Sequence, residues 1–425
     1  MYIISQGNVK IPPKISLSEM LDSDKRLFIN KQVVKPNYTL SGIDDILHRD
    51  NEIRMYYEYL KDIFSGVSPN NVFVYGKPGL GKTVLTKWIF EEIKREAEIR
   101  NVELCIININ CEELRTEHSI LQRIVQDLPA SNNEIKKVIG NSTSKHNEYF
   151  KYLVNNYKGI IIIVFDELDK ASNPEMINSI IRTESKLSGQ FPTIIGITND
   201  LGLRDKFPPH LKSTLCENTL IINPYDAGQL VDIIKARVKV AFKPNVVEES
   251  VIGLCAAFAA QEHGDARRAI DFLRVSGEIA EANGSSYVTE QDVREARDKL
   301  EMDRVIEVIK TLPTQLKTAL LSCIYMYNSP MENTTNNIYG MYRILADKIG
   351  IVTLTQRRVT DLLAELNQLG IIEGVNVYQG RQGRKKIITK ITSKEQALET
   401  LYQDYDLKTF SDESPSILFT MLNNS

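Results

Sequence analysis

A glycine-rich loop between two apolar segments carries the residues best suited to chemistry. It fits the pattern G-x-x-x-x-G-K-[ST], follows a run predicted to be a strand and opens a predicted helix, which is the context the pattern requires. The backbone N–H groups of such a loop surround an anion, and the helix N-terminus adds partial positive charge. Lys82 is expected to bridge the β- and γ-phosphates of a nucleotide as a catalytic contact, and the Thr83 hydroxyl to bind Mg²⁺. The predicted nucleotide-binding residues of the loop are Gly76, Lys77, Pro78, Gly79, Leu80, Gly81, Lys82, Thr83 and Val84.

Polar side chains follow two further apolar runs. Asp166 and Glu167 come directly after Ile160–Phe165, at the strand end where ligands bind in open α/β sheets. We expect Asp166 to hold Mg²⁺ and Glu167 to polarise the attacking water as general base, the alternative being two solvated acids at a strand end. Asn199 follows Thr193–Thr198 and is interpreted as a catalytic polar sensor, although an isolated Asn is more often a turn residue. The chain has no N-K-x-D guanine-reading motif, so ATP is favoured over GTP.

Composition limits the class of protein. The 425 residues (48.3 kDa) suggest two or three domains, and a hydrophobic fraction of 42% suffices for packed cores. A net charge of −3 means that nucleic-acid binding requires a local basic patch. Five scattered cysteines without CxxC spacing favour a reducing compartment. Since we find neither a signal-peptide pattern nor an apolar run of ~20 residues, we expect a soluble, cytoplasmic protein without membrane contact.

The order of the predicted elements divides the chain. Short β-branched runs alternate with helices up to Pro224, including a helix over 175–187, which predicts a parallel sheet covered on both faces. Residues 131–158 are interpreted as a surface connection. Only helices are predicted for the next 85 residues or so, the third of them opened by Gly264–Ala269, where Arg267 either reaches the nucleotide or is solvated. The segment before the first helix, residues 1–40, is interpreted as an arm with little core of its own.

A basic patch lies in the last third of the chain. Residues 351–390 contain seven basic and three acidic side chains, a net of +4. A helix that opens at Thr355 and a glycine-tipped hairpin carry most of this charge, an arrangement typical of a winged helix that binds duplex DNA. The alternative is a basic surface on a protein-interaction module. The predicted DNA-binding residues here are Thr355, Arg357, Arg358, Arg381, Arg384, Lys385 and Lys386.

Taken together, these motifs resemble the archaeal replication initiators of the AAA+ class, which are related to the largest subunit of the eukaryotic origin recognition complex and to the Cdc-six helicase loader. The resemblance also includes His48-Arg49-Asp50, Asp166-Glu167-Leu168-Asp169 and Pro224-Tyr225-Asp226-Ala227. It implies an α/β P-loop AAA+ core with a parallel sheet (41–224), an all-helical lid (225–310) and a winged helix (311–393). The last stretch has six acids against two lysines and is interpreted as an acidic tail (394–425). The resemblance further implies that Tyr225, Arg237 and Arg267 contact ATP or ADP. An insertion helix near 111–125 would offer Arg115 and Arg123 to DNA.

The resemblance implies a function and also shows one departure. The family implies an ATP-dependent initiator that binds origin duplex DNA, helps recruit or load the replicative minichromosome maintenance helicase, works with other initiator paralogues and is associated with the nucleoid. His210 stands where family members usually have an arginine, so ATP hydrolysis is expected to be slow unless Lys212 or Arg204 compensates. The alternatives are a nucleotide-bound transcription regulator with little turnover and a clamp-loader-like ATPase that acts on proteins.

Overall fold

The computed structural model describes residues 26–35, 38, 46–129, 142–173, 176–209, 212–213, 218–378, 384–411, 418–420 and 422. The chain forms two compact units that divide between Val293 and Arg294, and each is described by itself. Arg381 and His210 lie outside the described residues, as do the side chains of Arg384 and Lys385.

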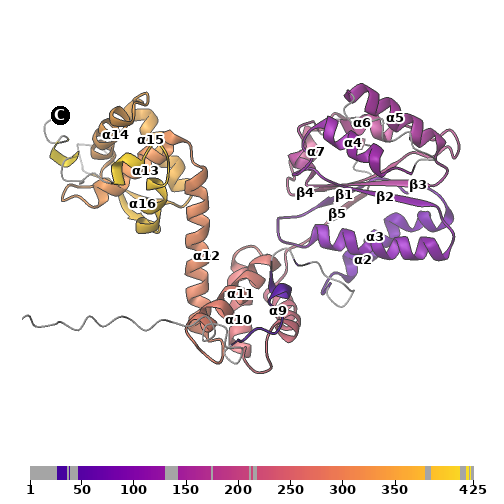
Figure 1. Ribbon diagram of the computed structural model, residues 1–425, viewed down its shortest axis with the longest axis horizontal. Coiled ribbons are helices and arrows are strands. Elements are labelled where there is room, and N and C mark those ends of the chain that lie inside the picture. Colours follow the sequence, from indigo (N-terminus) through magenta and orange to yellow (C-terminus); the bar gives the residue numbers. More distant parts are fainter. Residues whose placement is uncertain are drawn as a thin grey trace, which may run out of the picture. The chain divides into compact units, whose positions relative to one another are not determined.

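The first unit contains a five-stranded parallel sheet in the order β2-β3-β4-β1-β5 (Figure 1). Its strands are β1 (Val72–Tyr75), β2 (Leu104–Asn110), β3 (Ile160–Asp166), β4 (Thr193–Thr198) and β5 (Asn218–Ile221). The runs of β-branched residues are buried on both faces because helices cover both, as we expected for an α/β fold.

Alternate residues of β3 point into two separate cores. Ile160, Ile162 and Val164 pack with α2 (Asp50–Leu60) and α3 (Lys82–Ile99) on one face. Residues 161, 163 and 165 pack on the other face, which four helices cover (Figure 1). These are α4 (Glu117–Asp127), α5 (Thr143–Asn156), α6 (Ile177–Ile181) and α7 (Leu203–Lys206).

Two local expectations for this region are wrong. The supposed surface connection over 131–158 contains α5, whose Phe150 and Val154 are fully buried against the sheet. The helix predicted over 175–187 ends at Ile181. Polar side chains bind the backbone there: Thr183 donates to Ser179 O (2.8 Å) and Ser185 donates to Tyr157 O (2.9 Å), which favours turns over a continued helix.

A helical lid follows the sheet within the same unit. It is formed by α9 (Ala227–Ala241), α10 (Glu249–Gln261), α11 (Ala266–Ala282) and the start of α12 (Glu290–Thr311). The described part of the N-terminal segment packs on this lid: the backbone N–H groups of Leu27 and Phe28 donate to the Glu281 carboxylate, and Val34 is fully buried. Residues 26–35 therefore share the core of the lid.

The second unit is a winged helix. Its elements are α13 (Thr314–Tyr327), α14 (Thr335–Ile349), α15 (Gln356–Gln368), the antiparallel pair β6 (Ile372–Tyr378) and β7 (Arg384–Ile391), α16 (Lys394–Tyr402) and a 3-10 turn (Lys408–Ser411). The core continues past residue 393, where we placed the start of the tail, since Leu401, Leu407 and Phe410 are buried in it. None of the described helices has the length and apolarity that a membrane crossing requires.

Candidate functional site

The glycine-rich loop follows β1 and turns into α3. Gly79 and Gly81 adopt positive φ angles of 77° and 84°, a conformation in which a side chain is strained, and this lets the loop curl round the start of the helix. Lys82 is only 7% exposed. Its Nζ donates to Gly76 O (2.7 Å), Lys77 O (2.8 Å) and Asn199 Oδ1 (2.6 Å). A buried ammonium group on a glycine-rich loop at the start of a helix suits an anionic ligand.

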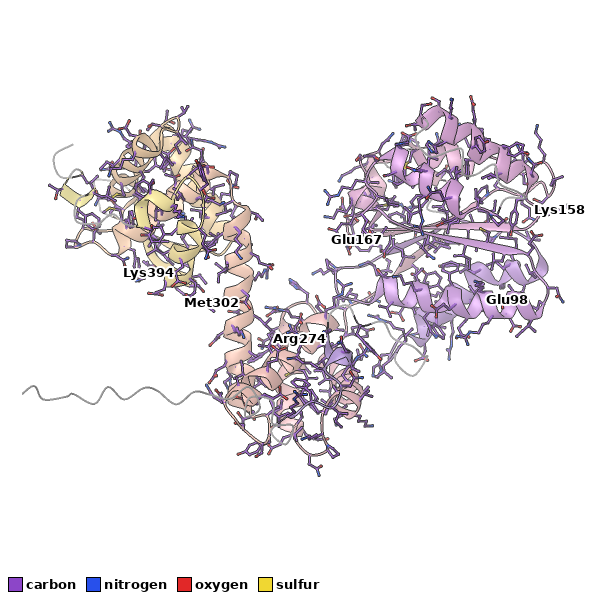
Figure 2. All side chains as sticks on the ribbon, in the orientation of Figure 1. Glu98, Lys158, Glu167, Arg274, Met302 and Lys394 are labelled. Carbon is purple, nitrogen blue, oxygen red and sulfur yellow. The ribbon has the colours of Figure 1, made fainter. Side chains whose placement is uncertain are left out.

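Acidic side chains lie at the end of β3, where Figure 2 marks Glu167. Glu167 adopts a left-handed conformation (φ 52°), which is uncommon for a residue other than glycine. Burial raises the pKa of Glu167, and the neighbouring carboxylate of Glu112 raises it further. Glu112 follows β2, whose end is joined to β3 by the hydrogen bond from Cys111 N to Asp166 O (2.9 Å). Sequence reasoning missed Glu112 because only the alignment of the strand ends brings the two acids together.

Asp169 positions the predicted sensor. Its Oδ1 accepts from the Thr198 hydroxyl (2.7 Å) and from the backbone N–H of Asn199 (3.2 Å). We did not predict this role, although Asp169 belongs to the Asp166–Asp169 tetrad. One pocket brings together ten residues, nine of them predicted to bind nucleotide or metal or to act in catalysis and Thr198 the tenth: Pro78, Gly79, Gly81, Lys82, Thr83, Asp166, Glu167, Thr198, Asn199 and Arg267.

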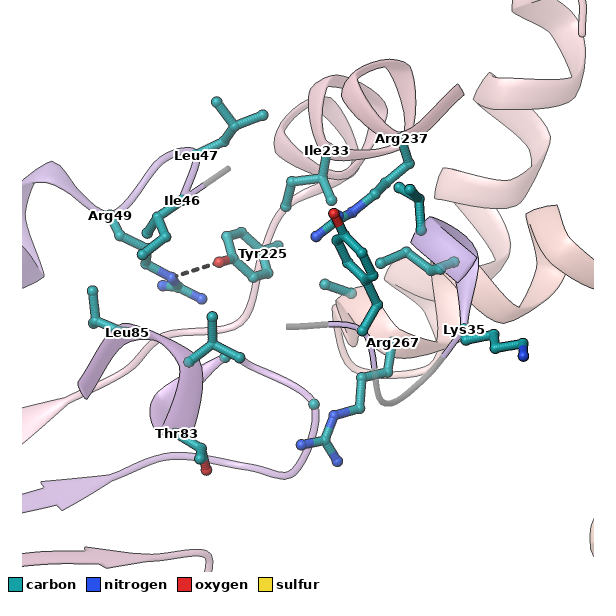
Figure 3. A pocket seen from close by; sticks show the side chains of 17 residues that line it. Lys35, Ile46, Leu47, Arg49, Thr83, Leu85, Tyr225, Ile233, Arg237 and Arg267 are labelled. Carbon is teal, nitrogen blue, oxygen red and sulfur yellow. Dashed lines mark hydrogen bonds between the residues drawn. The ribbon is translucent and has the colours of Figure 1, made fainter. Parts of the chain in front are cut away.

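A second, more apolar pocket adjoins the loop and is shared with the lid (Figure 3). The guanidinium of Arg237 lies in it, 5.4 Å from the ring centroid of Tyr38. Seven of the predicted residues line this pocket: Gly79, Gly81, Thr83, Val84, Tyr225, Arg237 and Arg267. The combination of apolar and cationic lining residues suits a base together with its charged phosphates. Three predicted loop residues, Gly76, Lys77 and Leu80, line neither pocket. The Leu80 side chain is buried in the core with α2 and α3.

The two adjacent arginines of α11 differ in their surroundings. Arg268 donates to the Glu262 carboxylate (2.6 Å) and lies over the ring of Phe272, so it is engaged within the lid. Arg267 is exposed and lines both pockets. The geometry therefore favours Arg267 as the arginine that faces a nucleotide.

The residues predicted to contact DNA occupy two regions. In the first unit, α4 begins at Glu117 and not near residue 111, because Thr116 caps it by accepting from Ser119 N (3.2 Å). Arg115 precedes this helix and donates to Glu112 O (3.1 Å), whereas Arg123 forms an ion pair with Asp127 (2.6 Å).

In the second unit, Thr355 caps α15, and Arg357 and Arg358 are exposed in its first turn. Lys386 lies on β7 and is partly exposed.

Arg204 and Lys212 of the first unit are the candidates to compensate for the arginine that His210 replaces. Arg204 is exposed, and Lys212 pairs with Asp205 (2.5 Å).

Three family models match successive parts of the chain. They are described as "ATPase family associated with various cellular activities (AAA)" over residues 72–223, "Cdc6 AAA+ ATPase-type lid domain" over 231–298 and "CDC6, C terminal winged helix domain" over 307–400. The chain is 40% identical over 412 residues to ORC1-type DNA replication protein 1 of Methanosarcina mazei, and this match covers 96% of the chain and 98% of the relative. The chain belongs to the ORC1-type DNA replication proteins.

Other ORC1-type relatives support the same family assignment. The chain is 39% identical over 396 residues to the ORC1-type DNA replication protein of Pyrococcus furiosus, covering 92% of this chain and 94% of the relative. The fold is similar to that of Aeropyrum pernix ORC1 solved in complex with DNA, with a TM-score of 0.72, 32% identity and coverage of 92% of this chain and all of that one. The predicted family and the order of AAA+ core, lid and winged helix are confirmed. Membership of the AAA ATPases also makes this chain a nucleotide-binding protein.

Proposed function

We propose that this chain is an ATP-dependent replication initiator that binds duplex DNA at origins in the cytoplasm and helps recruit the replicative helicase, together with initiator paralogues. The observation that carries the proposal is that Lys82, Asn199 and Arg267, from three separate parts of the chain, line one pocket. The ORC1-type relatives, and the solved relative whose structure contains DNA, support the role in replication.

The first unit supplies the groups for ATP binding and hydrolysis. Lys82 and Arg267 provide positive charge for the phosphates, and the apolar pocket beside Tyr225 receives the base. Glu167 is the candidate base for the attacking water. Asn199, held by Lys82 and by Asp169, is placed to orient the reacting groups.

Mg²⁺ suits the donor set of this site. The Thr83 hydroxyl and the Asp166 carboxylate both line the phosphate pocket, and hard oxygen donors are what Mg²⁺ prefers. When bound, the ion neutralises phosphate charge. The described residues contain no cluster of three or more His, Cys, Asp or Glu able to hold a metal ion, so a site with few protein ligands plus phosphate oxygens fits this chain.

The second unit supplies the candidate DNA surface. An exposed pair of arginines in the first turn of α15, Arg357 and Arg358, suits a helix that enters the major groove, and the basic hairpin suits phosphate contacts. Arg115 and Arg123 of the first unit are additional candidates. Contact with DNA would require Arg123 to exchange its partner Asp127 for phosphate.

A nucleotide-bound transcription regulator with little turnover remains the second candidate function. One observation favours it: His210 occupies the position where the family usually has an arginine, and a neutral imidazole does not replace a permanent positive charge. Chromatin mapping separates the two functions, because an initiator concentrates at the replication start whereas a regulator occupies scattered promoters.

Footprinting of origin duplex with ATP, with ADP and without nucleotide tests the proposal. We expect protection of a defined sequence whose extent depends on the nucleotide. The matched variants are Lys82→Ala, which removes the buried ammonium group, and Lys94→Ala, which removes an exposed one from the same helix. Only the first should abolish the nucleotide effect. Equal protection of origin and scrambled duplex, or unchanged ATP binding by Lys82→Ala, would contradict the proposal.

A further inference from the structure

Arg49 is almost fully buried, with 4% of its surface exposed, although it lies before α2 and outside the phosphate loop. Its guanidinium makes contacts in several directions. Nε donates to the Tyr225 hydroxyl (2.9 Å), and Nη2 donates to the backbone carbonyl of Leu80 (3.1 Å). Nη1 donates to the Glu52 carboxylate (2.8 Å) and to the carbonyl of Asn223 (3.0 Å).

These partners belong to two separate segments of the proposed nucleotide site. Leu80 is in the middle of the phosphate loop, whereas Asn223 and Tyr225 form the connection from β5 to the first lid helix, α9. The guanidinium carbon also lies 3.8 Å from the ring centroid of Tyr225, so Arg49 stacks on the same side chain to which it donates a hydrogen bond (Figure 3).

Tyr225 in turn is fixed to the lid. Its backbone N–H donates to Gly264 O (3.3 Å), and a β-carbon on Gly264 would overlap the Tyr225 carbonyl. Gly264 is followed by Asp265, the N-cap of α11, which is the helix that carries Arg267. One arginine therefore connects the phosphate loop, the hinge and, through Tyr225, the loop that opens α11.

The chemistry of arginine matches this position. Burial of a charge is unfavourable unless it is paired, and Glu52 provides the counter-charge. A planar guanidinium holds several acceptors in fixed directions, whereas a lysine ammonium is a flexible point charge. An apolar side chain could fill the space but could not hold two backbone carbonyls.

We propose that Arg49 is the positioning residue that couples the phosphate loop to the hinge of the lid, so that nucleotide binding fixes the lid orientation. The inference rests on the proposed nucleotide function. His48, the residue before Arg49, adds a contact with the lid, since its Nε2 lies 2.8 Å from Asp232 Oδ2 on α9.

The test uses the full-length protein with spin labels at two exposed lysine positions, Lys94 on α3 and Lys239 on α9, attached through unnatural amino acids. The distance distribution between the labels is measured with and without a saturating non-hydrolysable ATP analogue. The variants are Arg49→Lys, Tyr225→Phe and the matched control Arg54→Lys, an exposed position on α2. Circular dichroism establishes that each variant is folded.

We expect nucleotide to narrow the distribution in the natural protein and in Arg54→Lys. In Arg49→Lys the distribution should stay broad at saturation, with affinity for the analogue weakened about tenfold, the effect of losing one or two charge-assisted hydrogen bonds. In Tyr225→Phe, nucleotide should narrow the distance distribution only in part. If Arg49→Lys does not fold, the result with Tyr225→Phe tests the inference in its place.

Two results would overturn the inference while leaving the proposed function intact. In the first, Arg49→Lys and Tyr225→Phe show the same narrowing as the natural protein. In the second, the natural protein binds the analogue without any change in the distribution. Absence of binding by the natural protein would instead contradict the proposed function itself.

Discussion

Nζ of Lys82 donates a hydrogen bond of 2.6 Å to Oδ1 of Asn199. The two residues are 117 positions apart, at the start of α3 and after β4, and the parallel arrangement of β1 beside β4 brings them together. Asn199 therefore orients the group that is expected to contact the γ-phosphate. Its own backbone is fixed by Asp169.

Replacement of Asn199 by Ala should reduce hydrolysis more than binding. The variant keeps the ammonium charge but loses its orienting acceptor, so we expect kcat for ATP to fall about 100-fold to 1,000-fold, as is usual for the loss of one polar catalytic contact, with little change in Kd. Steady-state hydrolysis and fluorescent-nucleotide titration give the two values. Asn156→Ala, at an exposed position of α5, is the control. An equal loss of kcat and affinity would argue against a catalytic role.

ATP affinity should fall as the pH rises through about 8. Burial lowers the pKa of Lys82 to about 8, so that above this pH the free protein holds a neutral amine, which must take up a proton from solvent before it can pair with a phosphate. Affinity should weaken by up to about tenfold per pH unit above the pKa. Titrations with ATP between about pH 7 and 9.5 measure this dependence of affinity on pH. Lys82→Met should bind weakly and without this pH dependence, and a parallel decline in the variant would show that another group titrates.

Hydrolysis should also depend on Glu112 at acid pH. The pKa of Glu167 is raised by burial and by Glu112, so its base form is lost on acidification at a higher pH than for an ordinary glutamate. Glu112→Gln removes the neighbouring charge and should move the acid limb of the kcat profile to lower pH. Glu113→Gln, an exposed acid beside it, should leave the limb in place. Identical profiles for both variants would exclude this effect of Glu112.

Gly79 should be intolerant of a side chain for two separable reasons. Its φ of 77° strains any other residue by roughly 1 kcal/mol, and a β-carbon would overlap the carboxylate of Asp265 in the lid. Gly66 has a similar φ of 75° with open space around it, so Gly66→Ala isolates the strain. We expect Gly79→Ala to lower ADP affinity and the unfolding temperature more than Gly66→Ala. Addition of Asp265→Ala should partly restore affinity if overlap is the cause.

The sequence predicted the centre of the sheet well because β3 and β4 are buried on both faces. Val72–Tyr75 and Thr193–Thr198 coincide with β1 and β4, and the phosphate loop lies between a strand and a helix as expected. Prediction failed at α5, where Asn- and Ser-rich flanks concealed a helix whose buried face includes Phe150. It also failed at the end of α6, where side-chain bonds to the backbone override helical spacing.

The candidate site was predictable only where a local motif identifies it. Lys82, Asp166 and Asn199 each follow or open an element, and the sheet edge brings them together. Arg49 belongs to the His48-Arg49-Asp50 motif, but that motif does not indicate its role, and Glu112 has no local signal. Their roles depend on contacts with residues far away in the chain, such as that of Arg49 with Tyr225, and no spacing pattern records those contacts.

Removal of Arg357 should weaken duplex binding in a manner that depends on its type of contact. Arg357 is exposed in the first turn of α15, whereas Arg358 lies 3.8 Å from Asp361 and is partly neutralised. If Arg357 reads a base, Arg357→Ala should cost about 1–3 kcal/mol on the origin sequence and little on scrambled duplex. If it contacts phosphate, both affinities should fall together and the salt dependence should decrease. Fluorescence anisotropy at several salt concentrations separates these cases, with Gln368→Ala at the far end of the helix as control. Because α15 is the proposed groove-binding helix, unchanged affinity on both duplexes would exclude this face of the winged helix from the DNA interface.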